Sequence, residues 1–278
     1  MSADRFIVDE RVWIITKPTG VAGYDFDFRQ YLNCRTPYVA AGRLPGLLRI
    51  GAVADYAEWF QRCSDQGIEL VQTPQQHDLC SLLPQWYPLI EQHTPRSRWF
   101  AELPRYQDVE ALFDYPVFVK GSRQTSKHQA ALSIVRSRAD LERVINAFAS
   151  DRILHWQDFV CREYVALRSV KGGAGPEISP SFEFRTFWWR GTCVGAGRYW
   201  TQASPYDWNA IEKAEALVVG KSAADALDCP FVVIDLAQTC DGKWIVIECN
   251  AAMESGYAGA SPFAIWQEIL GLEARIGP

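Results

Sequence analysis

Two short apolar runs near the C-terminus predict a β-hairpin whose strands carry polar residues at their ends. The runs cover residues 231–234 and 244–247, and an Asp-Gly pair between them is a typical hairpin turn signal. The polar residues that follow the runs are Asp235, Glu248 and Asn250. Glu248 and Asn250 are two positions apart, so they share one face of a strand. Asp235 joins them if both strands belong to one sheet and the carboxylates point to the same open face.

Two carboxylates and an amide oxygen form a set of hard oxygen donors. Such a set suits Mg²⁺ that bridges phosphates. The alternative is an ordinary polar strand edge beside solvent. Acids and an Asn at the ends of apolar strands are costly to bury without a partner, and this cost favours the metal interpretation.

The N-terminal half alternates strand and helix patterns. Residues 12–15, 47–50 and 68–71 have the apolar and β-branched character of strands. Residues 55–63 place apolar side chains at helical spacing, and a strand follows directly. This alternation is typical of an α/β unit. Residues 75–104 predict a helix, a loop and a second helix that lead out of it.

The C-terminal half predicts mixed strands and helices. Residues 115–119 and 132–135 form strands, and 137–148 form a helix that begins with a capping box. Residues 181–199 form a hairpin around Arg190-Gly191, and a further helix closes the chain from about residue 265. The helix expected over 206–227 directs the following residues towards the core: Ile211, Ala214, Leu217, Val218 and Ala224.

A basic loop follows the strand at 115–119. The strand ends in Lys120, and the next seven residues contain Gly121, Ser122 and Lys127. Backbone N–H groups, hydroxyls and cations of this kind suit a chain of phosphates. The spacing of a Walker A loop is absent, and a solvated basic hairpin is the alternative.

The hairpin at 181–199 contains an arginine among aromatic residues. Arg185 lies between Phe184 and Phe187, where a guanidinium needs a partner or an anion. A salt bridge to Glu183 or Glu163 is one explanation. An anionic ligand is the other.

From about residue 112 onwards, the order of these motifs resembles that of the ATP-grasp ligases. The pattern D-x-loop-D-G-x5-E-x-N resembles the metal-binding signature of that family. The resemblance implies an α/β (α+β) ATP-grasp fold, in which an N-terminal α/β subdomain precedes two α+β subdomains that clamp ATP between antiparallel sheets. The implied boundaries are a pre-grasp domain at 1–111 and an ATP-grasp domain at 112–278, divided into a lid at 112–155 and a metal-binding part at 156–278.

The resemblance also implies a role for individual residues. Asp235, Glu248 and Asn250 would hold Mg²⁺ on the phosphates of ATP. Lys120 would lie across the α- and β-phosphates, and Arg185 and Arg198 would contact the transferred phosphoryl group or an acyl phosphate. The remaining nucleotide contacts would come from Ser122, Lys127, Gln157, Asp158, Phe159, Val160 and Glu163, with 159–160 at the adenine and Glu163 at the ribose. The loop 251–261 would bind the acceptor substrate.

One expected basic residue is missing from the pattern. Relatives often supply a first phosphate-binding cation before the lid, but no lysine occurs between Lys17 and Lys120. Arg96 or Arg98 could take its place. The lysine-poor N-terminal half and the E-F-R strand look most like the clade named for two arginines and one lysine, for which RNA or peptide modification has been proposed.

Composition narrows the possible settings. The chain has 278 residues, a net charge of −5, eight Cys and four His. No C-x-x-C spacing occurs, so a zinc site is not expected, and the thiols suit a reduced, cytoplasmic protein. No signal peptide and no membrane-spanning run is visible. The acidic balance argues against broad non-specific nucleic-acid binding.

The sequence therefore predicts an ATP- and Mg²⁺-dependent ligase. It would activate a carboxylate, of a small molecule or a peptide, as an acyl phosphate for attack by an amine or a thiol, and it would release ADP. An RNA end-joining or RNA-modifying ligase is the first alternative, and a non-catalytic nucleotide-binding protein is the second. Neither the substrates nor the oligomeric state follows from the sequence.

Overall fold

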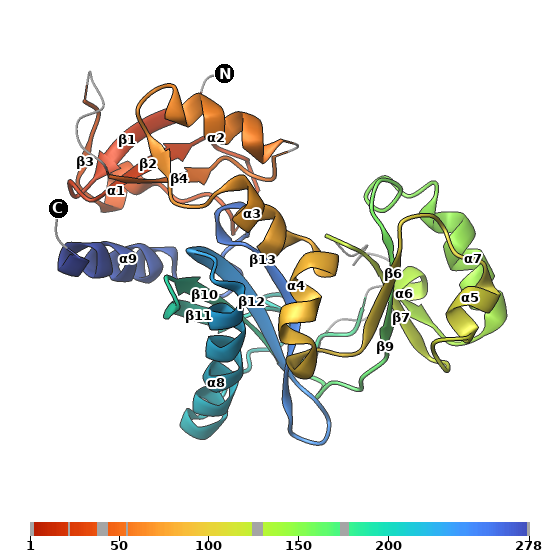
Figure 1. The fold of residues 1–278 in the computed structure, drawn as a ribbon. Coiled ribbons are helices and arrows are strands. Elements are labelled where there is room, and N and C mark those ends of the chain that lie inside the picture. Colours follow the sequence, from red (N-terminus) through yellow and green to blue (C-terminus); the bar gives the residue numbers. More distant parts are fainter. Residues whose placement is uncertain are drawn as a thin grey trace.

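Three β-sheets organise the chain. The computed structural model describes residues 3–21, 23–37, 44–53, 55–123, 130–172 and 178–276. Within these ranges the sheets follow one another along the sequence, and Figure 1 shows the middle sheet standing to one side of the other two. None of the helices in the described ranges is long and apolar enough to cross a bilayer.

The N-terminal sheet has the strand order β3-β1-β2-β4-β5. Its strands are β1 (Asp4–Val8), β2 (Val12–Thr16), β3 (Cys34–Arg35), β4 (Pro45–Arg49) and β5 (Glu69–Leu70), and its helices are α1 (Phe28–Tyr31) and α2 (Tyr56–Ser64). Strands β2, β4 and β5 are parallel, and α2 connects the last two. Asp55 caps α2 by accepting a hydrogen bond from the backbone of Glu58. The predicted α/β alternation is confirmed.

Two short helices lead from this sheet to the next. They are α3 (Pro74–Ser81) and α4 (Leu83–Ile90), followed by the 3₁₀ turn η1 (Glu91–His93). Thr73 and Gln76 form a capping box at the start of α3. Figure 1 shows both helices beside the C-terminal sheet, so the connection itself packs on the body of the protein.

The middle sheet has the strand order β6-β9-β7-β8 and its own apolar core. Its elements are β6 (Ser97–Phe100), α5 (Tyr106–Glu110), β7 (Val117–Gly121), α6 (Ala130–Ser133), β8 (Ile134–Val135), α7 (Arg138–Phe148) and β9 (Phe159–Glu163). Residues 132–135, expected as one strand, are divided between α6 and β8. The sheet takes strands from 97–163, so the predicted boundaries at 111 and 155 fall inside it.

The C-terminal sheet is antiparallel in the order β11-β10-β12-β13. Its elements are β10 (Glu183–Trp189), β11 (Thr192–Arg198), α8 (Ala210–Leu227), β12 (Phe231–Gln238), β13 (Trp244–Ala251), the 3₁₀ turn η2 (Ala252–Glu254) and α9 (Pro262–Ile276). Both predicted hairpins are present. Their turns use left-handed backbone at Arg190-Gly191 and at Gly242.

Each face of the C-terminal sheet has a separate core. Phe184, Trp188 and Leu236 pack in the core that includes α8, whereas Phe187 and Val233 pack in the core that includes α9. The N-terminal sheet contributes to both cores. The face of the sheet that packs against α9 also carries three charged residues, Arg185, Asp235 and Glu248.

A β-bulge interrupts the pairing of β12 with β13. Asp235 is opposite Glu248, but Leu236 is opposite Val246, so Ile247 has no partner in the ladder. Val246 and Cys249 therefore face the same core although they are three positions apart. If the same residues paired without a bulge and Val246 stayed in its core, strict alternation would turn Glu248 to the α8 side. The bulge places Glu248 on the same face as Asp235.

Helix α8 buries Ala224 and partly buries Leu217 as predicted, but its other three predicted core positions are exposed. Ile211 is 71% exposed and Val218 is 70% exposed, and Ala214 is also exposed. The buried residues are mostly small, and they are Ala216, Gly220, Ala223, Ala224 and Leu227. Small side chains let the helix lie close to the sheet, and this close approach decides the buried face rather than the size of the aliphatic residues.

The close approach of α8 to the sheet at Gly220 predicts that alanine will destabilise the protein there, although alanine normally stabilises a helix relative to glycine. A methyl group at Gly220 would lie 2.6 Å from Cζ2 of Trp188. Gly220→Ala should therefore lower the free energy of unfolding by about 1 kcal/mol, because overpacking exceeds the gain in helix propensity. Gly271→Ala in α9 meets no atom within 4 Å and should raise it by up to about 1 kcal/mol. Urea denaturation of both variants tests this, and equal changes would contradict the packing argument.

Candidate active site between two sheets

Three charged residues form a row across the C-terminal sheet. Arg185 on β10 is opposite Asp235 on β12, and Asp235 is opposite Glu248 on β13. Residues directly opposite one another in an antiparallel ladder point to the same face. Asn250 follows on that face two positions after Glu248. The structure thus brings together the three predicted metal-binding residues and Arg185.

Arg185 and Asp235 form a bidentate ion pair. The guanidinium Nε and Nη2 donate to the two carboxylate oxygens at 2.9 and 2.8 Å, and Nη1 donates to the carbonyl of Gly256 at 3.1 Å. Asp235 is 1% exposed. The partner of Arg185 is therefore Asp235, not Glu183 or Glu163 as the sequence suggested.

A second ion pair joins the middle sheet to the C-terminal sheet. Lys120 lies near the end of β7, and its ammonium donates to Oε1 of Glu248 on β13 at 2.5 Å. Both side chains are nearly buried. The Lys120–Glu248 pair is therefore the place where the predicted phosphate-binding lysine meets the predicted metal site.

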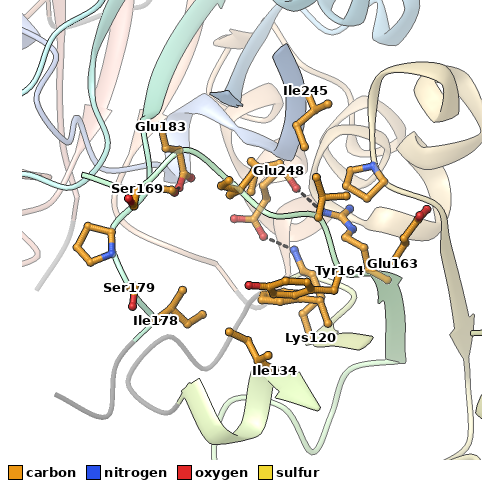
Figure 2. A pocket seen from close by; sticks show the side chains of 18 of the residues that line it. Lys120, Ile134, Glu163, Tyr164, Ser169, Ile178, Ser179, Glu183, Ile245 and Glu248 are labelled. Atoms are coloured by element: carbon orange, nitrogen blue, oxygen red, sulfur yellow. Dashed lines mark hydrogen bonds and ion pairs between the residues drawn. The ribbon is translucent and has the colours of Figure 1, made fainter. Parts of the chain in front are cut away.

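A cavity of about 360 Å³ opens beside this pair. Its apolar lining comes from both sheets and includes Phe118, Ile134 and Ile245. Tyr164 and Lys120 both line the cavity, and Figure 2 shows Glu183 and Ser169 on the opposite side of the Lys120–Glu248 pair from Glu163. Apolar walls with a few convergent polar groups are typical of small-molecule sites.

Glu183 is a site residue that the sequence did not identify as such. It lines the cavity and is 5% exposed. Its Oε2 accepts hydrogen bonds from Trp200 Nε1 at 3.0 Å and from Ser181 Oγ at 3.1 Å. Its position two residues before Arg185, on the same strand face, was the available signal.

The described start of the predicted phosphate loop, residues 121–123, is hydrogen-bonded to the segment before β9. Oγ of Ser122 accepts a hydrogen bond from the backbone of Asp158 at 3.3 Å, and Oε1 of Gln157 accepts one from the backbone of Arg123 at 2.8 Å. The structure brings Ser122, Gln157 and Asp158 together, although none of them lines the cavity. Lys127 lies outside the described residues.

The two residues predicted to contact adenine, Phe159 and Val160, do not line the cavity. Phe159 and Val160 are 1% and 0% exposed, and their strand β9 is paired on both sides by β6 and β7. Their backbone groups are therefore committed to the sheet, and they do not line the cavity. Glu163 does line it, together with Tyr164 and Val165, where the chain leaves the sheet. The apolar pattern of β9 does not show which part of the segment is free of pairing.

The remaining predicted cations do not gather at the cavity. Arg198 is opposite Phe184, so its side chain leaves the sheet on the face away from Arg185. Arg96 donates to the carbonyl of Leu112, and Arg98 donates to the carbonyl of Ser97. Arg136, which the sequence reasoning did not select, lines the cavity and is exposed.

A buried arginine holds the loop that follows Asn250. Arg49 on β4 is 2% exposed, and its Nη1 donates to the carbonyls of Ala252, Met253 and Ser255. Its Nη2 donates to the carbonyl of Tyr24 at 2.8 Å. The N-terminal sheet thereby fixes the start of the predicted acceptor loop.

Glu254, in the 3₁₀ turn η2, contacts residues from two other parts of the protein. Oε2 of Glu254 accepts from Nη2 of Arg123 at 2.5 Å, and its Oε1 lies 2.8 Å from Nε2 of His77. Arg123 lies just after β7, the strand that contains Lys120, and His77 lies on α3. Glu254 therefore connects the phosphate loop, the N-terminal part and the C-terminal sheet.

The donor set is compatible with Mg²⁺. Asp235, Glu248 and Asn250 offer only oxygen donors on one sheet face, which is the chemistry that this ion prefers. No group of three or more His, Cys, Asp or Glu in the described ranges is arranged to hold a metal. A divalent ion at this position would have to replace Lys120 at Glu248 and Arg185 at Asp235.

Two antiparallel sheets that face each other across a cavity, with a lysine from one and acids from the other, define the ATP-grasp architecture. The model of the ATP-grasp domain from family 3 of the two-arginine, one-lysine clade matches residues 89–269, and the protein belongs to this family. The clade is the one that the lysine-poor sequence suggested. No curated protein sequence matches the chain.

Solved structures show the same fold at low sequence identity. The D-alanine–D-alanine ligase of Bacillus anthracis complexed with ATP has a TM-score of 0.60 and 14% identity, covering 84% of this chain and 79% of its own. The VanG D-Ala:D-Ser ligase of Enterococcus faecalis has 0.58 and 15%, covering 82% and 72%. A RimK domain ATP-grasp protein of Sphaerobacter thermophilus has 0.53 and 14%, covering 87% and 83%. The predicted ATP-grasp fold is confirmed.

The Arg185–Asp235 ion pair predicts that the stability losses of single variants at the two positions will not add up in the double variant. Asp235→Leu leaves a nearly buried guanidinium without its carboxylate and should lower the free energy of unfolding by about 3 kcal/mol. The double variant Arg185→Met/Asp235→Leu should lose at least about 1 kcal/mol less than the sum of the single variants. Urea denaturation of the four proteins measures this coupling, and additive losses would show that the pair is not coupled.

Proposed function

We propose that the protein is an ATP- and Mg²⁺-dependent ligase that joins a carboxylate to an amine or a thiol and releases ADP. The contact between Lys120 and Glu248 at the cavity is the observation that carries this proposal. It places a cation and a carboxylate from opposing sheets within one site. A nucleoside triphosphate needs both, because its phosphates bind cations and its metal ion binds carboxylates.

Each charged residue then has a defined task. Asp235, Glu248 and Asn250 would hold Mg²⁺, which when bound neutralises charge on the β- and γ-phosphates. With Glu248 engaged by the metal, Lys120 would be available to bind phosphate oxygens. With Asp235 engaged in the same way, Arg185 would be available to the transferred phosphoryl group. The site exchanges two internal ion pairs for contacts with its ligand, so little net charge is left uncompensated.

The chemistry requires no nucleophilic side chain. A carboxylate oxygen of the first substrate attacks the γ-phosphorus, and the bond to the β,γ-bridging oxygen breaks to release ADP. The resulting acyl phosphate is attacked at its carbonyl carbon by an amine or a thiol, which loses a proton as phosphate leaves. Lys120 and Arg185 offset the charge that develops in the first step. Arg198, the other arginine proposed for this step from the sequence, faces away and is given no role.

The apolar end of the cavity suits the base of the nucleotide. Phe118, Ile134 and Ile245 would flank the ring, and the backbone at Tyr164 and Val165, beyond the last paired residue of β9, would meet its edge. Glu163 would stay near the ribose. Arg136 supplies the rim cation that the sequence left unassigned, in place of Arg96 or Arg98.

The products released from ATP test the proposal directly. The protein is incubated with ATP, Mg²⁺ and pools of amino acids, peptides or RNA, and ADP and AMP are quantified. ADP formation that depends on an amino-acid or peptide acceptor is expected. AMP formation that depends on RNA would instead establish a nucleic-acid ligase. ATP binding without release of either product in any pool would indicate a non-catalytic nucleotide-binding protein.

The Lys120–Glu248 ion pair predicts that replacing either residue will lower the activity. Lys120→Met and Glu248→Gln should each lower ADP release at least about 10²-fold, because each removes charge that stabilises phosphoryl transfer. Lys221→Met on α8, which breaks only the exposed pair with Asp225, serves as the control and should leave the rate unchanged. Circular dichroism confirms that each variant is folded. Full activity in either site variant would contradict the assigned roles.

A further inference from the structure

Arg162 connects the two sheets at the bulge that positions Glu248. It lies on β9 of the middle sheet, and its Nη1 donates to the carbonyl of Ile247 at 2.6 Å. Ile247 is the residue that the β12–β13 ladder leaves without a partner. A carbonyl freed by a bulge needs a donor from elsewhere, and here the donor comes from the opposing sheet.

The guanidinium is held in place on its other side as well. Nε of Arg162 donates to Oγ of Ser97 at 3.0 Å, and the guanidinium lies over the ring of Trp86 at 5.7 Å from its centroid. Arg162 is 4% exposed and lines the cavity. Burying a cation in this position costs desolvation free energy unless its hydrogen bonds compensate for the lost hydration.

The hydrogen bonds of Arg162 do not fully compensate for the desolvation of its guanidinium. Its Nη2 is buried and has no hydrogen-bond partner among the described residues. Burial lowers the pKa of the guanidinium to about 10, while the nearby charge of Glu248 opposes that shift. An apolar residue would avoid the cost, so stability alone does not account for arginine here.

We propose that Arg162 is a positioning residue for the divalent cation: by binding the carbonyl of Ile247 it fixes the bulge, and the bulge keeps Glu248 on the cavity face. The proposal rests on the proposed function for the identity of the ligand. Relaxation of the bulge would move the register by one residue and turn Glu248 towards the α8 core. Because Arg162 belongs to the opposing sheet, the geometry of the metal site depends on how the two sheets meet.

Cation binding tests this role with three variants. Mn²⁺ is titrated by electron paramagnetic resonance against wild type, Arg162→Met, Arg162→Lys and Arg98→Met in the presence of saturating ATP. Arg162→Met should raise the Mn²⁺ concentration at half-saturation at least tenfold. Arg162→Lys, which can still donate to the Ile247 carbonyl, should recover most of the affinity. Arg98→Met removes an exposed arginine of the same sheet and should bind as wild type does.

Hydrogen–deuterium exchange tests the positioning step without any ligand. Amides of residues 244–251 should exchange at least tenfold faster in Arg162→Met than in wild type, whereas residues 4–16 of the N-terminal sheet should be unaffected. Unchanged exchange at 244–251 would overturn the proposal, and so would equal Mn²⁺ affinity in Arg162→Met and wild type. A wild-type protein that fails to bind Mn²⁺ with ATP would overturn the proposed function, while the exchange result would still decide whether Arg162 holds the bulge.

Discussion

The contact between Lys120 and Glu248 is the interaction on which the proposed chemistry depends. It joins the middle sheet to the C-terminal sheet, and it buries two charges between them. Buried ion pairs seldom improve stability over apolar residues of similar volume, because desolvation offsets most of the attraction. The pair is better explained as two ligand-binding groups that satisfy each other. The cavity beside it supplies the space that a nucleotide requires.

Other acids near the cavity are paired with cations in the same way. Asp235 is paired with Arg185 and Glu254 with Arg123, so three acids of this region, Glu248 included, each form an ion pair with an arginine or a lysine. The bulge at Ile247 aligns two of these acids on one face. A regular hairpin of the same sequence would have left Glu248 among apolar side chains, where an unpaired carboxylate is strongly disfavoured. Backbone irregularity and charge pairing are therefore parts of one arrangement.

Local patterns in the sequence were sufficient for the hairpins, the strand that ends near Lys120 and the order of motifs. They rely on turn residues and on alternation within a few positions. Features decided by tertiary packing were beyond such patterns. The buried face of α8 depends on how closely Gly220 approaches Trp188, and the pairing of Phe159 and Val160 depends on β6, a strand far earlier in the chain. The partner of Arg185 depends on register between strands, and Arg162 acquires its role only from the opposing sheet.

In the segment that follows Asn250, Arg49 donates hydrogen bonds to main-chain oxygen atoms at positions 252, 253 and 255, and its guanidinium also lies over the ring of Tyr257. Carbonyl groups are common to all residues, so mutations at positions 252, 253 and 255 would leave these anchoring contacts available. The segment can therefore vary in chemical character while its backbone course is retained. Evolution could alter what the protein accepts as its second reactant there without rebuilding the scaffold, and related chains that differ in this segment would still share its path.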